Sequence, residues 1–133
     1  MKRNFFIFCM LLCSVSAFVQ PKDEQKRIPQ GRWEFENITA FEENMQIPFG
    51  VNDLTFEIPT EMNVQQDELI FVHRESTQRV KYGTVVRGKY LCFLVCAEWK
   101  VEGNRLLLQW VQDVDNLENV SGSRTIVLTY KLK

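Results

Sequence analysis

The feature that most constrains this sequence is an alternation of apolar and polar side chains with a period of two, which continues through most of residues 31–132. Such alternation places successive side chains on opposite faces of a β-strand, so it predicts half-buried strands rather than helices. The 133 residues are enough for one such domain. The pattern defines seven strands, at residues 31–38, 54–65, 68–73, 78–87, 89–102, 105–112 and 124–132.

The clearest hairpin is centred on Gly103 and Asn104, which lie between two alternating runs. A glycine at the first position of a two-residue loop favours a type II′ turn. Counting outward from this turn places Trp99 opposite Leu108 on the more apolar of the two faces. We therefore expect the Trp99 face to point into the core.

Three further turns continue this count toward the N-terminus and keep the same inner face. They are predicted at residues 88–89, 74–77 and 66–67. The 74–77 loop would place Phe71 opposite Val80. Agreement among successive hairpins is stronger evidence for a fold than any single strand. The sequence therefore predicts an all-β protein.

An antiparallel up-and-down β-barrel of about eight strands is the architecture that we predict. A closed barrel of this type needs an even number of strands, so that the first and last strands pair antiparallel. The eighth strand would come either from a split of residues 54–65 at Pro59, because proline is not found in a central strand, or from residues 114–120. The sequence leaves both alternatives open.

The first 17 residues have the layout of a secretory signal peptide. Residues 1–4 are basic, residues 5–13 form an apolar run, and Val15 and Ala17 are small residues at the positions that signal peptidase reads. The apolar run is too short to span a bilayer, so no transmembrane segment is expected in the mature chain. We expect cleavage after Ala17 and export to the periplasm or the exterior; the alternative is a lipoprotein anchored at Cys13.

The mature chain is expected to begin with a polar leader at residues 18–30, followed by the barrel domain at residues 31–133. It carries 14 Lys and Arg against 17 Asp and Glu, which gives a net charge of −3. This acidic balance argues against nucleic acid as a partner.

Two cysteines, Cys92 and Cys96, remain after removal of the signal peptide. They lie four residues apart in the predicted 89–102 strand, and four strand residues span roughly 13 Å. A disulfide requires Cα atoms within about 7 Å, so two unbridged thiols are predicted. The single histidine, His73, cannot complete a zinc site with them, and no metal or other cofactor is expected.

Side chains typical of catalysis do not come together in the predicted register. His73 would lie at a barrel rim with no serine or cysteine beside it on the same face. Asp113, Asp115 and Glu118 form a small acidic cluster that lacks the glycine and the 12-residue frame of an EF-hand, so it is interpreted as a solvated loop. We therefore expect that the protein is not an enzyme.

Residues 39–53 are predicted to form a long loop, which is unusual in a compact all-β domain. The loop carries spaced apolar side chains, including Phe41, Met45 and Phe49. Long loops of this kind are often functional. We expect it to fold over one mouth of the barrel as a lid.

The predicted inner face is rich in aromatic rings, which either line a ligand cavity or fill the barrel. The opposite face is also partly apolar, and its residues Cys92, Leu94 and Cys96 would form an outward patch suited to a homodimer or a protein partner. The rings expected on the inner face are Phe56, Phe71, Tyr82, Phe93, Trp99, Trp110 and Tyr130, together with Trp33.

The Gly31-Arg32-Trp33 motif at the start of the first strand, the long loop and the meander that follows give this chain a resemblance to the calycin superfamily. It is most similar to the short lipocalin-like domains of secreted bacterial proteins, over about residues 31–132. The resemblance implies that Trp33 closes the base of the barrel and that the 39–53 loop covers the open end. It also implies that a small, usually apolar ligand is held inside.

Two functions are therefore predicted as alternatives. The first is an exported binding protein for a small apolar ligand, whose site is formed by the lid and the inner wall. The second is a filled barrel that acts as a protein–protein interaction module through its outer apolar patch.

Overall fold

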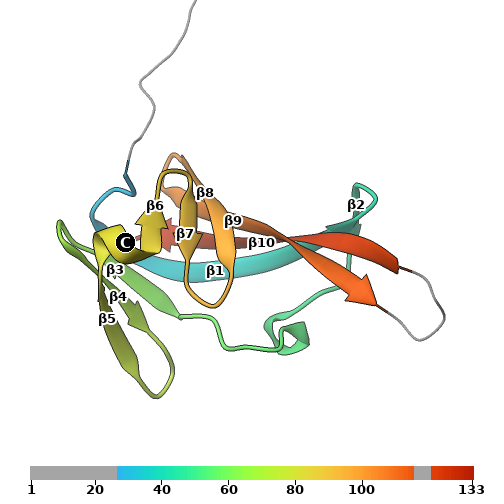
Figure 1. The fold of residues 1–133 in the computed structure, drawn as a ribbon, viewed down its shortest axis with the longest axis horizontal. Coiled ribbons are helices and arrows are strands. Elements are labelled where there is room, and N and C mark those ends of the chain that lie inside the picture. Colours follow the sequence, from blue (N-terminus) through green and yellow to red (C-terminus); the bar gives the residue numbers. More distant parts are fainter. Residues whose placement is uncertain (1–26, 116–120) are drawn as a thin grey trace, which may run out of the picture.

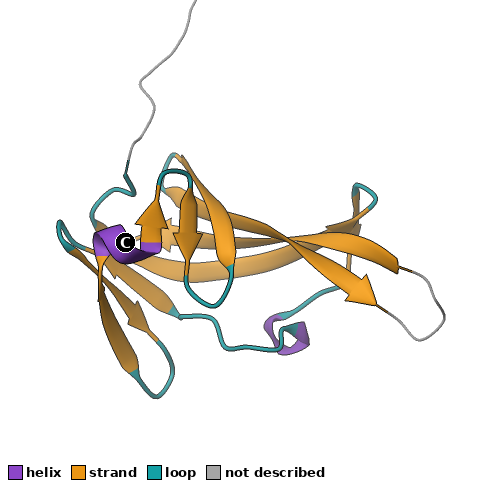
Figure 2. Ribbon diagram, viewed as in Figure 1, coloured by secondary structure: helices purple, strands orange, loops and turns teal. Residues whose placement is uncertain are grey.

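The computed structural model describes residues 27–115 and 121–133, which form one curled antiparallel sheet (Figure 1). Strands make up most of the described chain, so the all-β prediction is confirmed (Figure 2). In chain order the elements are β1 (Gly31–Glu42), β2 (Met45–Ile47), the 3₁₀ turn η1 (Val51–Asp53), β3 (Glu61–Val64), β4 (Glu68–Val72), β5 (Thr77–Lys81), the helical turn α2 (Tyr82–Val85), β6 (Val86–Arg87), β7 (Tyr90–Cys92), β8 (Cys96–Glu102), β9 (Arg105–Asp115) and β10 (Ser121–Leu132).

Hydrogen bonds join the strands in the order β5-β4-β3-β1-β10-β9-β8-β7-β6, with β2 paired to β1. Strands that follow one another in the chain are mostly neighbours in the sheet, as in an up-and-down meander. The first strand, β1, lies between β3 and the C-terminal strand β10. The two edges of the sheet, β5 and β6, do not pair with each other. The sheet is therefore an open half-barrel (Figure 1).

Short turns set the hairpin registers as the sequence predicts. Gly103 has a φ of 63°, and Trp99 lies opposite Leu108 across this turn. Gly88 has a φ of 59° in the predicted turn at residues 88–89. Glycine adopts this left-handed region without the steric cost that a Cβ would bring. These local counts are confirmed because the turn geometry alone fixes which residues face each other.

The Gly-x-Trp motif has a packing role at the start of β1. Gly31 has a φ of 142°, and a Cβ added there would lie 2.7 Å from Cδ1 of Leu132. Two residues later, Trp33 is fully buried, and its indole Nε1 donates a hydrogen bond to the Pro29 carbonyl oxygen at 3.0 Å. The absence of a side chain at residue 31 thus lets the end of β10 approach β1 beside the buried indole.

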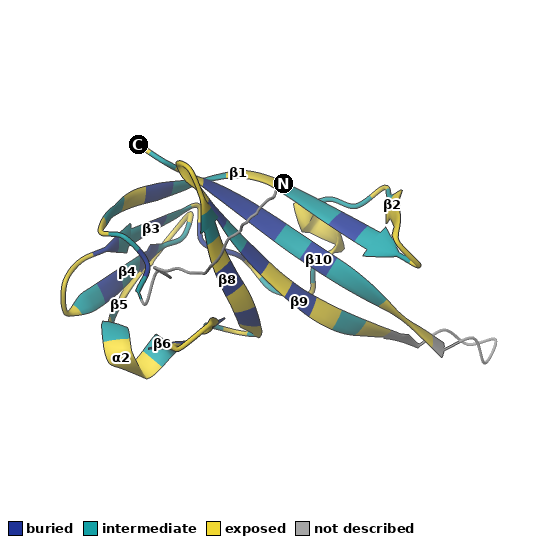
Figure 3. Ribbon diagram, turned by 90° about the horizontal axis from the view of Figure 1, so that it is seen from above, coloured by how far each residue is buried: buried dark blue, intermediate teal, exposed yellow. Residues whose placement is uncertain are grey.

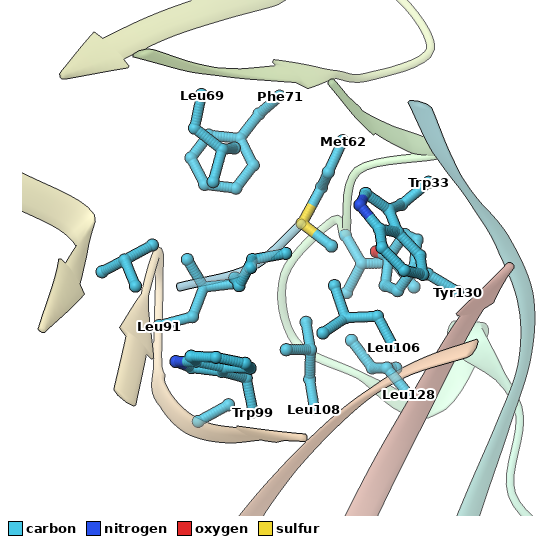
Figure 4. Packing of buried hydrophobic residues seen from close by; sticks show 14 of the residues in the cluster. Trp33, Met62, Leu69, Phe71, Leu91, Trp99, Leu106, Leu108, Leu128 and Tyr130 are labelled. Atoms are coloured by element: carbon cyan, nitrogen blue, oxygen red, sulfur yellow. The ribbon is translucent and has the colours of Figure 1, made fainter. Parts of the chain in front are cut away.

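The core is built from the inner face of the curled sheet. Buried residues alternate with more exposed ones along β8 and β9 (Figure 3). Core side chains from both halves of the sheet point toward one another (Figure 4). The fully buried ones include Trp33, Leu69, Leu91, Leu106, Leu108, Leu128 and Tyr130.

The prediction of a closed barrel is wrong, because the predicted 78–87 strand is interrupted. Residues 82–85 form α2 instead, so that β5 and β6 become separate edges. Gly83, which has no side chain to pack in a strand, lies in this turn. The Tyr82 hydroxyl accepts a hydrogen bond from the backbone N–H of Ile28 at 2.8 Å, and the Arg27 guanidinium lies 4.2 Å from the centroid of its ring. These tertiary contacts favour a turned conformation over a continuous strand.

The prediction of unbridged thiols is also wrong, because the predicted 89–102 strand turns back on itself at residues 93–95. The N–H of Phe93 donates to the carbonyl oxygen of Val95 at 2.9 Å. Cys92 lies opposite Cys96 across the turn, with Cα atoms 4.0 Å apart, and the two form a disulfide. The distance argument failed because it assumed a continuous strand.

The loop between β4 and β5 also differs from the prediction. It spans residues 73–76, where the N–H of His73 donates to the Ser76 carbonyl oxygen at 2.8 Å. Phe71 therefore lies opposite Gln78 rather than Val80. The register has shifted by two residues, so the same side chains still face inward.

Residues 39–53 do not form one long loop. β1 continues to Glu42 and makes a tight hairpin with β2, whose turn residues Glu43 and Asn44 have φ values of 52° and 66°. This is the backbone of a type I′ turn, which joins two strands directly. The chain lacks strand structure from residue 48 to residue 60, so the predicted 54–65 strand is reduced to β3. Of the two proposed sources of an eighth strand, Pro59 lies before β3, and residues 116–120 are outside the described residues.

Residues 27–30, at the end of the predicted leader, pack on the sheet. Ile28 is fully buried in the core. Beside it, the Arg27 guanidinium donates to the Gln65 carbonyl oxygen at 2.9 Å. This short segment therefore covers the core next to α2.

Candidate functional site

Four aromatic side chains cluster on the inner side of the half-barrel. The Phe93 ring lies 6.3 Å, centroid to centroid, from each of Phe56, Phe71 and Trp110, and Phe56 lies 6.1 Å from Trp110. Edge-to-face and tilted contacts of this kind are favourable packing arrangements. The structure thus brings together four of the predicted inner-wall residues, of which Phe71 and Trp110 are buried and Phe56 and Phe93 are partly buried.

The other predicted inner-wall rings lie apart from this cluster. Tyr130 packs edge-on against Phe35 with ring centroids 5.7 Å apart. The Trp99 indole donates to the Gly88 carbonyl oxygen at 2.8 Å, and Tyr82 contacts the segment before β1. All three are therefore engaged in contacts within the protein.

A groove of about 480 Å³ lies beside the irregular segment that precedes β3. We call it the 51–60 groove. Its apolar walls are Phe35, Val51, Leu54, Phe56, Ile58 and Pro59, and its polar groups are Asn52, Thr55, Glu57, Thr60 and Arg74. Six apolar residues and five polar ones thus line the groove, which offers both apolar surface and hydrogen-bonding groups to a small molecule.

The segment that forms the 51–60 groove is held at both ends. At its start, the N–H of Gly50 donates to the Asp53 carboxylate at 2.8 Å. At its end, Thr60 accepts a hydrogen bond from the N–H of Phe35 and donates one to Val72, at 3.0 Å and 2.7 Å. The groove is therefore formed by a fixed stretch of backbone without regular structure.

A smaller pocket of about 210 Å³ lies at the opening of the half-barrel, and we call it the edge pocket. It is bounded by β4 and β5 on one side and by α2 and the 93–95 turn on the other. The residues that line it are Glu57, Pro59, Phe71, His73, Gln78, Val80, Val85, Cys92, Phe93 and Leu94.

The outer face of β7, β8 and β9 exposes several apolar side chains. Val111 is 63% exposed and Tyr90 is 42% exposed, and Leu94, in the 93–95 turn that joins β7 to β8, is 67% exposed. A shallow pocket of about 350 Å³ lies on this face and includes Tyr90, Cys96 and Val111. Leu94 and Cys96 of the predicted outer patch are therefore solvent-exposed, whereas Cys92 is half-buried.

The predicted lid residues lie on or near the β1–β2 hairpin. Phe41 pairs with Thr125 of β10 and is half-buried, whereas Met45 is 70% exposed. The Phe49 ring lies 5.4 Å from the guanidinium of Arg124. None of the three lid residues lines the 51–60 groove.

Ion pairs between neighbouring segments cover the outer surface. Arg105 bonds to Glu36 at 2.8 Å and, mainly through this hydrogen bond, lowers the pKa of the Glu36 carboxyl group. Arg79 has the same effect on the pKa of Glu68 in the adjacent strand. Exposed pairs of this kind contribute little stability individually.

Sequence reasoning missed the polar part of the 51–60 groove. Glu57 and Arg74 lie outside the strands, so no periodic pattern marks them. The Arg74 backbone N–H donates to the Glu57 carboxylate at 3.3 Å, a contact between residues 17 positions apart. Phe56 is the one residue of the groove that the sequence also singled out for a site.

Comparisons of the chain with protein-family models, with curated proteins and with solved structures find no match. In the described part of the chain, no helix is long and apolar enough to cross a membrane. Residues 27–115 and 121–133 also hold no cluster of three or more His, Cys, Asp or Glu side chains that could bind a metal ion. Of the predicted acidic cluster, Asp113 and Asp115 lie in β9 and Glu118 falls outside the described residues.

Proposed function

We propose that this protein is an exported binding protein that takes a small, mainly apolar molecule into the 51–60 groove. The observation that carries the proposal is the groove itself, whose volume of about 480 Å³ is within the range of roughly 300–1,000 Å³ that small-molecule sites occupy. Phe35, Leu54 and Phe56 offer apolar surface to the ligand. Glu57 and Arg74 at the same groove can orient a polar group.

This proposal moves the ligand from the centre of the barrel to its side. The inner side of the half-barrel holds the aromatic cluster of Phe56, Phe71, Phe93 and Trp110. The 51–60 groove lies instead between residues 51–60 and Phe35 of β1. A lipocalin-like relationship belongs to the same proposal and is supported by the buried Trp33 and by the meander order of the strands. This protein has an open half-barrel, whereas a lipocalin has a closed barrel.

A binding role without catalysis is also part of the proposal. Of the described residues that line the 51–60 groove, none is His, Cys or Ser. The groove therefore lacks the Ser–His or Cys–His pair that activates the commonest nucleophiles. The groove's chemistry is therefore suited to holding a molecule rather than transforming it.

Native mass spectrometry of the protein purified from its own host tests the proposal. We expect a population heavier than the bare chain by the mass of one small molecule, which organic extraction removes. The mass of the extracted chain should correspond to a start at Phe18, as export with signal-peptide cleavage requires. A bare chain in every preparation would contradict the binding function.

A second candidate function is protein–protein association through the outer face of β7–β9. The observation that favours it is the exposure of Tyr90 and Val111 on that face and of Leu94 in the turn between β7 and β8. Sedimentation of the wild-type protein and of Leu94→Glu tests it. A dimer that the charge dissociates would support this function, and a monomer at all concentrations would exclude self-association.

A further inference from the structure

The edge pocket lies where the curled sheet fails to close. β5 and β6 are the two edge strands and do not pair with each other, and α2 joins them. Glu57 and Pro59 are shared with the 51–60 groove, but the other residues of the edge pocket come from β4, β5, the loop between these two strands, α2 and the turn closed by the disulfide. The pocket is therefore distinct from the 51–60 groove.

One wall of the edge pocket is aromatic. Phe71 is nearly fully buried, and its ring centroid lies 6.3 Å from that of Phe93. Val80 and Val85 extend the apolar wall toward the opening. A flat ring placed here can stack or pack edge-on against these side chains, as aromatic pairs prefer.

The remaining wall is polar. His73, Gln78 and Glu57 line it, and their side chains include both hydrogen-bond donors and acceptors. Nδ1 of His73 is buried and has no hydrogen-bond partner among the described residues. Buried polar atoms in proteins are nearly always paired. His73 itself is half-buried and lines the pocket, so a rotation of its ring can bring this unpaired nitrogen to a ligand group.

We propose that the edge pocket is a second ligand site, which takes one aromatic ring bearing a hydroxyl group. Its volume of about 210 Å³ suits a single substituted ring, since an apolar protein cavity of roughly 150 Å³ binds benzene. The ring would pack on Phe71 and Phe93, and the hydroxyl would hydrogen-bond to His73 and Gln78. This site does not depend on the function proposed for the 51–60 groove.

A pair of matched ligands tests the chemistry of this site. Phenol and toluene have nearly the same shape, but only phenol carries a hydroxyl. Water solvates phenol better, so a purely apolar pocket would prefer toluene. In an NMR titration of the backbone amides we expect phenol to bind at least tenfold more tightly than toluene, with the largest shifts at His73, Gln78 and Phe93. Equal or tighter binding of toluene, or shifts centred elsewhere, would overturn the proposal.

Two variants locate the hydroxyl contact. His73→Phe keeps a ring and removes both ring nitrogens, and Gln78→Leu removes the amide group at an exposed position. At least one of them should weaken phenol binding tenfold or more while leaving toluene binding unchanged. Gln30→Leu, an exposed glutamine outside the pocket, is the control and should bind both ligands as the wild type does. Unchanged phenol affinity in both variants would contradict the proposed contact.

Discussion

The hydroxyl of Tyr130 donates a hydrogen bond of 2.7 Å to the carbonyl oxygen of Pro59. Tyr130 is fully buried in β10, and Pro59 lies in the segment that forms the 51–60 groove. The bond therefore ties the most extensively paired part of the sheet to a stretch of backbone that has no strand partner of its own. Proline cannot donate to a strand ladder, so its carbonyl group is the part of the residue that the sheet can hold.

This bond predicts how stability changes at alkaline pH. Burial raises the pKa of Tyr130, whereas tyrosine in the unfolded chain ionises near pH 10. Above about pH 10 ionisation therefore stabilises the unfolded state alone, so the contribution of Tyr130 is complete below that pH and is lost as the pH rises.

Tyr130→Phe removes both the bond and this titration. We expect the variant to lose about 0.5–1.5 kcal/mol of unfolding free energy at pH 7. The difference in unfolding free energy between the wild type and the variant should shrink between about pH 10 and pH 12, because only the wild type loses stability there. Urea unfolding of both proteins at several pH values measures the difference, and a constant difference throughout that range would contradict the assignment.

The register of the β8–β9 hairpin predicts opposite outcomes for two adjacent residues. Trp99 is 8% exposed and its indole bonds to Gly88, whereas Lys100 points to solvent. We expect Trp99→Ala to cost about 3–5 kcal/mol of unfolding free energy. Lys100→Ala should stay within about 0.5 kcal/mol of the wild type. Denaturant unfolding compares the two, and a larger cost at Lys100 would show that the faces are reversed.

The disulfide predicts that neither Cys92 nor Cys96 is a reactive thiol. We expect Cys92 and Cys96 to resist alkylation in unfolded, unreduced protein and to react after reduction. Because the bond closes a loop of only a few residues, chain-entropy arguments give it about 2 kcal/mol of stabilisation. Cys92→Ser/Cys96→Ser should therefore fold with a correspondingly lower stability. Alkylation of both cysteines without reduction would contradict the pairing.

Local features of the sequence predicted much of this fold. The turns at Gly88 and Gly103 fix their hairpins by counting, and the period-two pattern identifies the inward face. The Gly31–Trp33 motif marks the start of β1, where the closeness of Leu132 requires a glycine. Each of these depends on residues that are neighbours in the sequence or directly paired.

The features that sequence reasoning missed depend on contacts between distant residues. The 78–87 strand breaks because Tyr82 bonds to Ile28, 54 positions away. Residues 54–60 leave the sheet and are anchored by Tyr130, 71 positions from Pro59. The alternating pattern indicates the inward-facing rings that form the aromatic wall of the 51–60 groove. The position of the groove and its polar residues could not be inferred, because they depend on such long-range contacts.

The central claim is that the 51–60 groove binds an apolar molecule, and one pair of valines offers a matched test. Val51 lines the groove and is 43% exposed, whereas Val111 lies on the outer face of β9 and is 63% exposed. A charge at either position leaves the core intact. Only a charge at residue 51 would enter the groove, where an apolar ligand would desolvate it at a cost.

Fluorescence titration with a dansyl-labelled fatty acid is the most direct measurement. We predict saturable binding by the wild type, at least tenfold weaker binding by Val51→Asp, and unchanged binding by Val111→Asp, with all three proteins equally stable in urea. The absence of saturable binding by the wild type, or equal affinity of the two variants, would contradict the account.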